Sequence, residues 1–242
     1  VVDTYLEQIN SEYSELGNRK VAYSEVDLIT HDAGGNRLVR KAETNLGDLC
    51  AEAMRSSVDA DIGYVNGGGI RSNISVGNVT FNDLLAVFPF NNTVVLAQIS
   101  GQDIKDMLEM AIMKWPNEDG CFPHLAGINF SVNTSIPSSV LTNELEEFQG
   151  VLGEYRVYDI KIFNRETETY EPIILDKKYT IAAANYYLLD CGSGMTMFKN
   201  VEILRNDGML DVEALERYIV EELNGNIGQE YANVENNITF TE

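Results

Sequence analysis

Apolar residues recur at helical spacing in several parts of the chain, and a capping residue precedes most of these segments. The predicted helices are Val1 to Leu16, Thr44 to Met54, one that opens at Phe81, one that opens at Gly101, and Val212 to Leu223. Thr44 and Asp211 are the expected N-caps of two helices. Thr80 and Ser100, each followed by Asp three residues later, form variants of the capping box. Gly17 is the expected end of the first helix.

Short and alternating apolar runs predict strands between these helices. They are Val21 to Ile29, Asp61 to Val65, Thr93 to Ile99, Gly127 to Val132, Val157 to Phe163 and Tyr179 to Ala184. The polar stretch Asn133 to Gly150 is predicted to be a long loop or excursion. Strands and helices follow one another too unevenly for a doubly wound sheet. The pattern therefore predicts an α+β fold of mixed sheets packed with helices, preceded by one helix.

The composition indicates a folded and strongly acidic protein. With 242 residues and 44% hydrophobic content, the chain can bury a sizeable core. A formal charge of −21 repels polyphosphate backbones and argues against binding to nucleic acid or to an anionic membrane. A small anion can still bind where some of the 17 Lys and Arg converge. No apolar run approaches the roughly 20 residues of a membrane span, and the opening Val1-Val2-Asp3 does not resemble a signal peptide.

The cysteines are too widely spaced for a zinc site or a dense disulfide framework. They are Cys50, Cys121 and Cys191. Buried or bystander thiols are the favoured interpretation, because free cysteine packs as a small apolar residue. A single disulfide is the alternative.

A glycine run follows the strand predicted at 61–65. Asn66-Gly67-Gly68-Gly69-Ile70-Arg71 lets a ligand approach the backbone closely and leaves N–H groups directed outward. Arg71 can add a fork of donors for a phosphate or a carboxylate. The run is neither G-x-G-x-x-G nor a Walker loop. A tight turn with a solvated arginine is the open alternative.

Two aromatic segments are candidates for stacking on a planar ligand. In Phe88-Pro89-Phe90 the proline restricts Phe88, which would hold Phe90 at a loop tip. Tyr186 and Tyr187 precede a small glycine-containing loop and can provide the second face of an aromatic clamp. The alternative is that both phenylalanine rings pack in the core, and that Tyr186 at least does so as well.

The chain lacks the residues of a self-contained catalytic centre. A two-metal phosphohydrolase needs a crowd of His, Asp and Asn ligands, whereas the two histidines, His31 and His124, lie in unrelated contexts. No G-x-S-x-G elbow is present, and no Ser or Cys has a flanking His at a recognisable spacing. We therefore assign no catalytic residue, metal ligand or resident cofactor to this chain.

Four segments together resemble the C-terminal domain of the 5′-nucleotidase family, which includes UDP-sugar hydrolases, 2′,3′-cyclic-nucleotide phosphodiesterases and ecto-5′-nucleotidase. They are Arg40-Lys41-Ala42-Glu43-Thr44-Asn45-Leu46-Gly47-Asp48, Asn66 to Arg71, Phe88-Pro89-Phe90 and Asn185 to Gly194. They occur in the family's order and at its spacing. The resemblance extends from about Val21 to the C-terminus and implies that family's α+β fold.

The resemblance implies a base-binding role for several residues. Asn66 and the backbone near Gly68 would contact the base, and Phe90 would stack on one face of it. Tyr187 matches the second stacking aromatic when its loop is aligned on the glycines. Tyr186 is the alternative register.

The resemblance also implies contacts to the ribose and the phosphate. Arg40 and Arg71 correspond to the arginines that hold this side of a nucleotide, which agrees with a local anion trap on an acidic domain. The family's loop usually reads Gly-Gly-Asp-Gly, whereas this chain has Cys191-Gly192-Ser193-Gly194. Ser193 can form a hydrogen bond to the ribose but supplies no charge. Loss of the carboxylate is expected to weaken ribose recognition by roughly 1 to 3 kcal/mol.

The resemblance places the chemistry in a second domain. An N-terminal metallophosphoesterase domain, absent from this chain, would supply two divalent metal ions and the water nucleophile. Residues 1–20 would be the interdomain bridging helix, and residues 21–242 the substrate-specificity domain. The full protein would hydrolyse nucleoside phosphate esters, with a nucleotide or nucleoside as ligand and the catalytic domain as partner in cis. Family members act outside the cytoplasm, so an extracellular, cell-wall or periplasmic location is expected.

Two other functions fit the same fold. A non-catalytic surface or binding module would keep the fold and lose the nucleotide, which Ser193 in place of the family's Asp favours. A sulfur-oxidising hydrolase would act on a substrate without a base. The aromatic pair Phe90 and Tyr187 argues against this last alternative.

Overall fold

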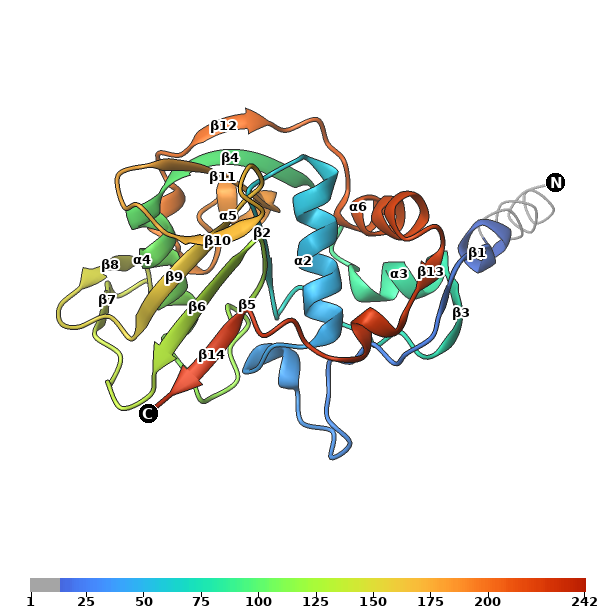
Figure 1. The fold of residues 1–242 in the computed structure, drawn as a ribbon, viewed down its shortest axis with the longest axis horizontal. Coiled ribbons are helices and arrows are strands. Elements are labelled where there is room, and N and C mark those ends of the chain that lie inside the picture. Colours follow the sequence, from blue (N-terminus) through green and yellow to red (C-terminus); the bar gives the residue numbers. More distant parts are fainter. Residues whose placement is uncertain (1–13) are drawn as a thin grey trace.

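The structure is a computed structural model and describes residues 14–242. The largest of its sheets is a five-stranded mixed sheet (Figure 1). Its strands lie in the order β12 (Glu202–Arg205), β4 (Val94–Ser100), β11 (Lys178–Ala184), β2 (Ile62–Asn66) and β5 (Pro123–Ala126). β11 pairs antiparallel with β4 and parallel with β2, and β5 pairs antiparallel with β2. The ends of β2 and β11 therefore lie beside the starts of β4 and β5. We call this edge the loop end of the sheet.

Three smaller sheets complete the β-structure. A four-stranded sheet has the order β10 (Thr169–Pro172), β9 (Val157–Asn164), β6 (Ile128–Asn133) and β14 (Ile238–Thr241). A three-stranded sheet has the order β13 (Asn226–Ile227), β1 (Lys20–Ser24) and β3 (Gly77–Thr80), and β7 (Val140–Thr142) pairs with β8 (Phe148–Val151). The last strand, β14, pairs in parallel with β6.

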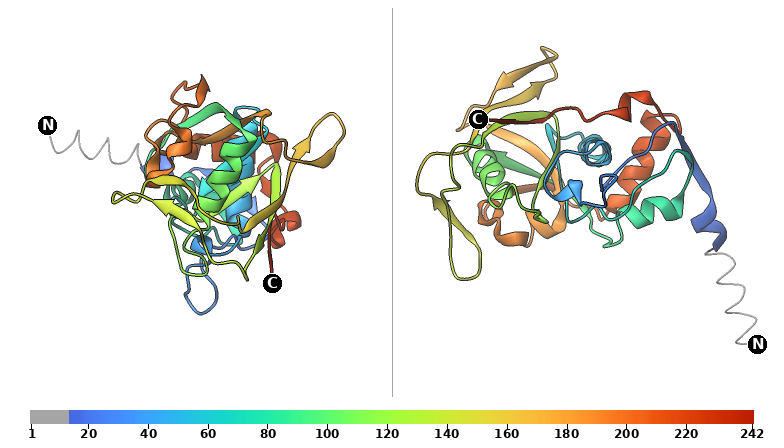
Figure 2. Two further views of the ribbon diagram at one scale, coloured as in Figure 1. Left: turned by 90° about the vertical axis from the view of Figure 1, so that its left-hand side faces the viewer. Right: turned by 90° about the horizontal axis from the view of Figure 1, so that it is seen from below.

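Helices divide the interior into two hydrophobic clusters. They are α2 (Asn45–Ser57), α3 (Phe81–Val87), α4 (Gly101–Ala111), α5 (Asn185–Leu188) and α6 (Asp211–Arg217). Single helical turns are η1 (Leu38–Arg40), η2 (Gly192–Gly194), η3 (Thr196–Phe198), η4 (Tyr218–Glu222) and η5 (Gln229–Ala232). One cluster lies between the five- and four-stranded sheets and α4, and the other joins α2, α3 and α6. Figures 1 and 2 show α2 at the centre, between the larger sheets and α3 with α6.

The predicted caps are confirmed at three helices. The Thr44 hydroxyl accepts the Gly47 N–H at 3.1 Å and opens α2. Thr80 and Asp83 form a reciprocal capping box at the start of α3. The Ser100 hydroxyl accepts the Asp103 N–H at 3.1 Å and opens α4. These are contacts between near neighbours in the chain, which explains why sequence patterns predict them well.

Other predictions need correction. The stretch 133–150 is not a continuous loop, because β7 and the start of β8 form a hairpin there. Leu210 is the N-cap of α6, and Asp211 is the first residue of that helix rather than its cap. The strand predicted over 21–29 ends at Ser24. Residues 14–18 are helical, and the remainder of the helix predicted over Val1 to Leu16 lies outside the described residues.

Two predictions on composition can be checked directly. Cys50, Cys121 and Cys191 are all free thiols, so the favoured interpretation of the cysteines is confirmed. Among residues 14–242, no helix is long and apolar enough to cross a membrane.

Candidate functional site

Sheet register brings the four sequence segments of interest to one place. Asn66 ends β2 opposite Pro123, and Ala184 ends β11 opposite Val94. The glycine run after β2, the Phe90 loop before β4 and the tyrosine loop after β11 therefore meet at the loop end. Asn185 ties two of these loops together, because its side chain accepts the Thr93 N–H at 2.9 Å. Its own N–H donates to the Thr93 carbonyl at 2.8 Å.

The glycine run does not present free amides, contrary to the sequence prediction. The N–H groups of Gly67 and Gly68 donate to the carbonyls of Phe122 and Gly120 at 2.8 and 2.9 Å. The Asn66 side-chain amide also donates to the Gly120 carbonyl, at 2.8 Å. These bonds fasten the run to the segment before β5. The half-buried Asn66 and Gly68 remain the parts of this run that can meet a ligand.

Gly67 is required by close packing against the turn that carries Arg40. A Cβ atom at Gly67 would lie 1.9 Å from the Val39 carbonyl oxygen, well inside any real contact. The same oxygen accepts a hydrogen bond from His124 Nε2 at 2.9 Å, so His124 is the Nε2–H tautomer. Burial lowers the pKa of His124 to about 4, and the ring is neutral near pH 7. Gly67 and His124 therefore hold the Arg40 turn from two sides.

Three arginines gather beside the glycine run, and we call Arg37, Arg40 and Arg71 the arginine cluster. Burial, and then the charges of Arg37 and Arg71, lower the pKa of Arg40. Arg40 Nε is buried and has no hydrogen-bond partner among the described residues. Arg71 Nη1 donates to the Gly68 carbonyl at 3.3 Å. Unpaired cations held together in this way attract an anion.

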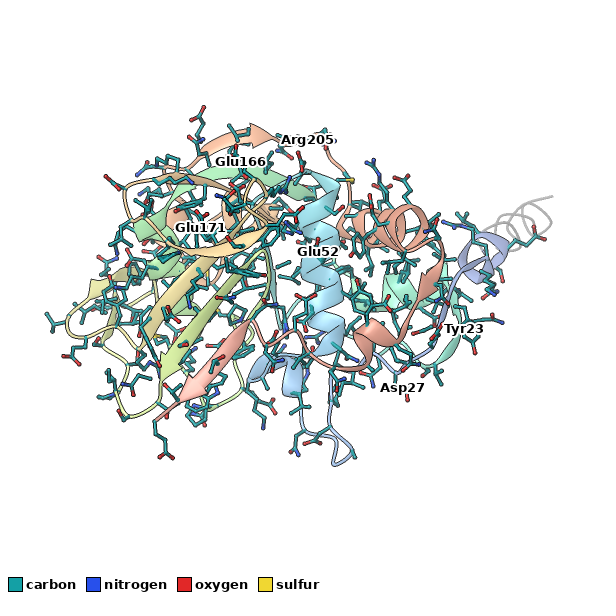
Figure 3. The ribbon with its side chains drawn as sticks, viewed as in Figure 1. Tyr23, Asp27, Glu52, Glu166, Glu171 and Arg205 are labelled. Carbon is teal, nitrogen blue, oxygen red and sulfur yellow. The ribbon has the colours of Figure 1, made fainter. Side chains whose placement is uncertain are left out.

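Sequence reasoning missed Arg37. It lies three residues before Arg40 in a chain with only 17 Lys and Arg. This closeness in sequence could have predicted that Arg37 belongs to the same cluster. Glu118 and Asp119 oppose the arginine charge, and the Asp119 N–H donates to the Arg40 carbonyl at 2.9 Å. Elsewhere acidic side chains are common on the surface, and the exposed Glu166 and Glu171 are labelled in Figure 3.

Phe90 lies at an exposed loop tip, as predicted. Its side chain is 57% exposed, whereas Phe88 is 3% exposed and packs in the core. The guanidinium carbon of Arg71 lies 5.7 Å from the centre of the Phe90 ring. The alternative that both rings pack in the core is wrong for Phe90 and correct for Phe88.

In the second aromatic segment, Tyr187 is buried and Tyr186 is exposed, the opposite of what the sequence predicts. Tyr187 is 1% exposed and packs edge-on against Tyr64, with ring centres 5.2 Å apart. Tyr186 is 45% exposed, and its hydroxyl accepts the Ser193 N–H at 3.0 Å. Because a buried ring has no free face, Tyr186 is the ring available for stacking. This corrects the expectation that Tyr187 presents such a face.

Ser193 lies on the inner side of the tyrosine loop. Its φ of 55° is in the left-handed region, and its hydroxyl is 3.4 Å from that of Tyr187. A cavity of about 430 Å³ borders Ser193 and is also lined by Lys114, Asp119 and Cys121. Burial raises the pKa of Cys121 to about 11, so this thiol is not a nucleophile at neutral pH.

The donor groups at the loop end are mostly cationic or neutral. Within residues 14–242, no group of three or more His, Cys, Asp and Glu side chains is arranged to hold a metal ion. The donors at the loop end are guanidinium and amide groups with a few hydroxyls, which suit an anionic ligand rather than a cation. The arrangement can bind and orient a planar anion.

Comparison with known proteins identifies the family of this fold. A family model described as 5′-nucleotidase, C-terminal domain, matches residues 20–200. A 5′-nucleotidase of Vibrio vulnificus is 32% identical over 138 residues, which cover 57% of this chain and 25% of that protein. The trifunctional nucleotide phosphoesterase protein YfkN of Bacillus subtilis is 36% identical over 151 residues, 60% of this chain and 10% of that protein.

A solved structure has the same fold over almost the whole chain. The 5′-nucleotidase precursor of Thermus thermophilus superposes with a TM-score of 0.79 and 25% identity, covering 99% of this chain and 43% of that one. The chain thus spans less than half the length of each of these relatives. The matched range contains every residue of the loop-end site, from Arg37 to Ser193. The chain belongs to the 5′-nucleotidase family, of which it contains the C-terminal domain.

Proposed function

We propose that this domain binds a nucleoside monophosphate at the loop end and presents its phosphate ester to a catalytic domain of the same protein. The observation that carries the proposal is the exposed Phe90 ring beside the arginine cluster. A planar apolar face next to unpaired cations matches a base joined to a phosphate through a ribose.

The phosphate and ribose contacts rest on the arginine cluster. Arg40 holds a partly buried charge next to two other arginines, which is unfavourable without an anion. A bound phosphate would supply acceptors for Arg40 Nε and for the guanidinium of Arg71, with the short distance of a charge-assisted hydrogen bond. Ser193 would contribute one neutral hydrogen bond to the ribose.

The base contacts rest on two exposed rings. Phe90 and Tyr186 lie in loops that Asn185 joins, so both rings belong to one end of the sheet. Stacking on an aromatic side chain contributes about 1–3 kcal/mol per base. The Asn66 side-chain oxygen and the backbone at Gly68 would contact the edge of the base.

The hydrolysis itself would belong to the rest of the protein. Both sequence relatives have names that describe phosphate-ester hydrolysis, and this chain covers a minority of each. We propose that an N-terminal metallophosphoesterase domain holds two divalent metal ions and the attacking water. We further propose that the full protein acts outside the cytoplasm, in the periplasm, cell wall or extracellular space.

A second candidate function is a binding module that has lost its nucleotide. Ser193 favours it, because the family's aspartate at this position would bond the ribose and the serine supplies no charge. The exposed Phe90 and the unpaired Arg40 Nε favour the first candidate instead.

Calorimetric titration with adenosine, AMP and ribose 5-phosphate distinguishes the two functions. We expect AMP to bind more tightly than adenosine, and ribose 5-phosphate to bind weakly. The Phe90→Ala variant should lose base-dependent affinity, whereas Tyr170→Ala, on β10, should bind as the wild type. Absence of AMP binding at millimolar concentration would favour the module that has lost its ligand.

A further inference from the structure

Two acids in the segment Arg40 to Asp48 have no role in the proposed function. The Glu43 carboxylate accepts the N–H groups of Asn237 and Ile238 at 2.8 and 3.1 Å. Asp48 Oδ2 accepts the Glu235 N–H at 3.0 Å. Both acids therefore hold the same segment, 235–238, which leads directly into β14. We call this contact the C-terminal latch.

The latch contains one buried carboxyl, Asp48, and one half-buried carboxyl, Glu43, and it has no counter-ion among the described residues. Asp48 is 1% exposed, and its Oδ1 has no hydrogen-bond donor among the described residues. No ion pair within residues 14–242 includes Glu43, Asp48 or Glu235. Two carboxylates next to each other in this setting repel strongly. One proton between them removes that repulsion.

The surrounding ionisable groups do not neutralise the pair. Glu235, from the C-terminal segment, adds a further carboxylate near both acids. From β5, the His124 ring packs against Gly47 and is neutral near pH 7. From α2 itself, burial raises the pKa of the Cys50 thiol well above its usual range, so it is neutral as well. Each facing element thus contributes either no charge or a negative one.

Backbone N–H groups donate unequally to the two acids. Two N–H groups donate to Glu43, and one donates to Asp48. Burial, and then the charge of Glu43, raise the pKa of Asp48 to about 9. Burial also raises the pKa of Glu43. Because Asp48 is the more buried of the two acids, its carboxyl is the expected site for a proton that serves both.

We propose that Glu43 and Asp48 share one proton, that the shared proton closes the C-terminal latch on the first turns of α2, and that the latch weakens as the pH rises. The proton on Asp48 Oδ1 turns this oxygen into a donor toward the Glu43 carboxylate. Its loss leaves two negative charges, one on the buried Asp48 and one on the half-buried Glu43, next to the backbone of residues 235–238.

The direction of the pH dependence follows from the proton count. The folded chain keeps a proton on Asp48 up to about pH 9, whereas the unfolded chain loses it near the usual value of 3.8. The stability that Asp48 contributes is fully present below the pKa of the unfolded chain. It is lost as the pH rises through the pKa of the folded chain. The folding equilibrium constant should fall by up to about tenfold per pH unit between pH 6.5 and 8.5. His124 and Asp211, whose pKa values are about 4 and about 6, titrate below this window.

Urea unfolding of the 242-residue chain between pH 6.5 and 8.5 tests the latch. Asp48→Asn keeps the shape and supplies a permanent donor to Glu43. We expect this variant to lose the slope and to exceed the wild type in stability at pH 8.5. The matched control is Asp176→Asn at an exposed acid, which should keep the wild-type slope. An Asp48→Asn variant with the wild-type slope would overturn the proposal.

A measurement on the wild type keeps the test valid if the variant does not fold. Carboxyl carbon chemical shifts, followed by NMR with ¹³C-labelled aspartate, report the titration of Asp48 directly. A midpoint above pH 7, together with pH-dependent amide shifts at Glu235, Asn237 and Ile238, is expected. A midpoint below pH 5 would show that both acids are ionised at neutral pH and would contradict the shared proton.

Discussion

The guanidinium carbon of Arg71 lies 5.7 Å from the centre of the Phe90 ring, which joins the charged and the aromatic parts of the loop-end site. In the absence of ligand the arginine covers one side of an otherwise exposed ring. A base that stacks on Phe90 would place its ribose and phosphate beside Arg71 and Arg40. Through this contact, the ring proposed to stack on the base lies next to an arginine proposed to bind the phosphate.

Phe90→Ala should weaken AMP binding by about 1–3 kcal/mol and change the stability of the domain very little, because the ring is exposed. Calorimetry and urea unfolding measure the two effects. Phe88→Ala is the matched control, since its buried ring should cost about 3–5 kcal/mol of stability. Unfolding of Phe90→Ala would show that the ring is part of the core.

Tyr186→Ala should reduce affinity for adenosine and AMP alike, because Tyr186 is the exposed ring of the second aromatic segment. Tyr187→Phe removes only a hydroxyl from a buried ring and should bind the base normally. Calorimetric titration of both variants checks the assignment. Unchanged binding of both ligands in Tyr186→Ala would contradict this assignment and favour the Tyr187 register that the family resemblance implies.

Arg40→Gln should lower affinity for AMP by roughly ten- to a hundredfold, since hydrogen bonds to charged groups contribute about 1.5–3 kcal/mol. Adenosine lacks the phosphate and should bind this variant as it binds the wild type. Arg217→Gln, at an exposed arginine paired with Glu221, is the control and should affect neither ligand. Equal losses for the two ligands would place Arg40 away from the phosphate.

Gly67→Ala should destabilise the domain by several kcal/mol, because the added Cβ would lie 1.9 Å from the Val39 carbonyl oxygen. The expected magnitude, about 3 kcal/mol or more, follows from overpacking against backbone that cannot yield. Gly120→Ala is the control, since its Cβ would find its nearest neighbour at an ordinary 3.8 Å. Urea midpoints of the two variants should differ clearly. Similar midpoints would mean that the Arg40 turn is free to shift.

His124 should reduce stability in acid. Its folded pKa is about 4 and its usual value is 6.5, so the unfolded chain binds a proton that the folded chain does not. Stability from this group is complete above pH 6.5 and falls by about 3 kcal/mol as the pH drops to about 4. An NMR titration of the imidazole measures the folded pKa. Unfolding of His124→Gln, which can still donate to the Val39 carbonyl, should show a flatter acid dependence than the wild type.

Sequence alone determined the features that depend on neighbours along the chain. The caps at Thr44, Thr80 and Ser100 join residues three positions apart, and the runs at β2, β4 and β11 carry their apolar pattern locally. The α+β class and the order of the binding segments follow from the same local information. The family was also identifiable, because its motifs are short and contiguous.

Tertiary structure alone decided which groups are free to act. Tyr186 and Tyr187 are adjacent in one helical turn, and only packing against Tyr64 determines which ring is buried. The N–H groups of Gly67 and Gly68 donate to the carbonyls of Phe122 and Gly120, more than fifty residues away along the chain. The sequence pattern therefore could not predict that these N–H groups are already hydrogen-bonded. Local spacing carries the periodicity of helices and strands, whereas exposure and hydrogen-bond partners depend on contacts between segments that only the folded chain brings together.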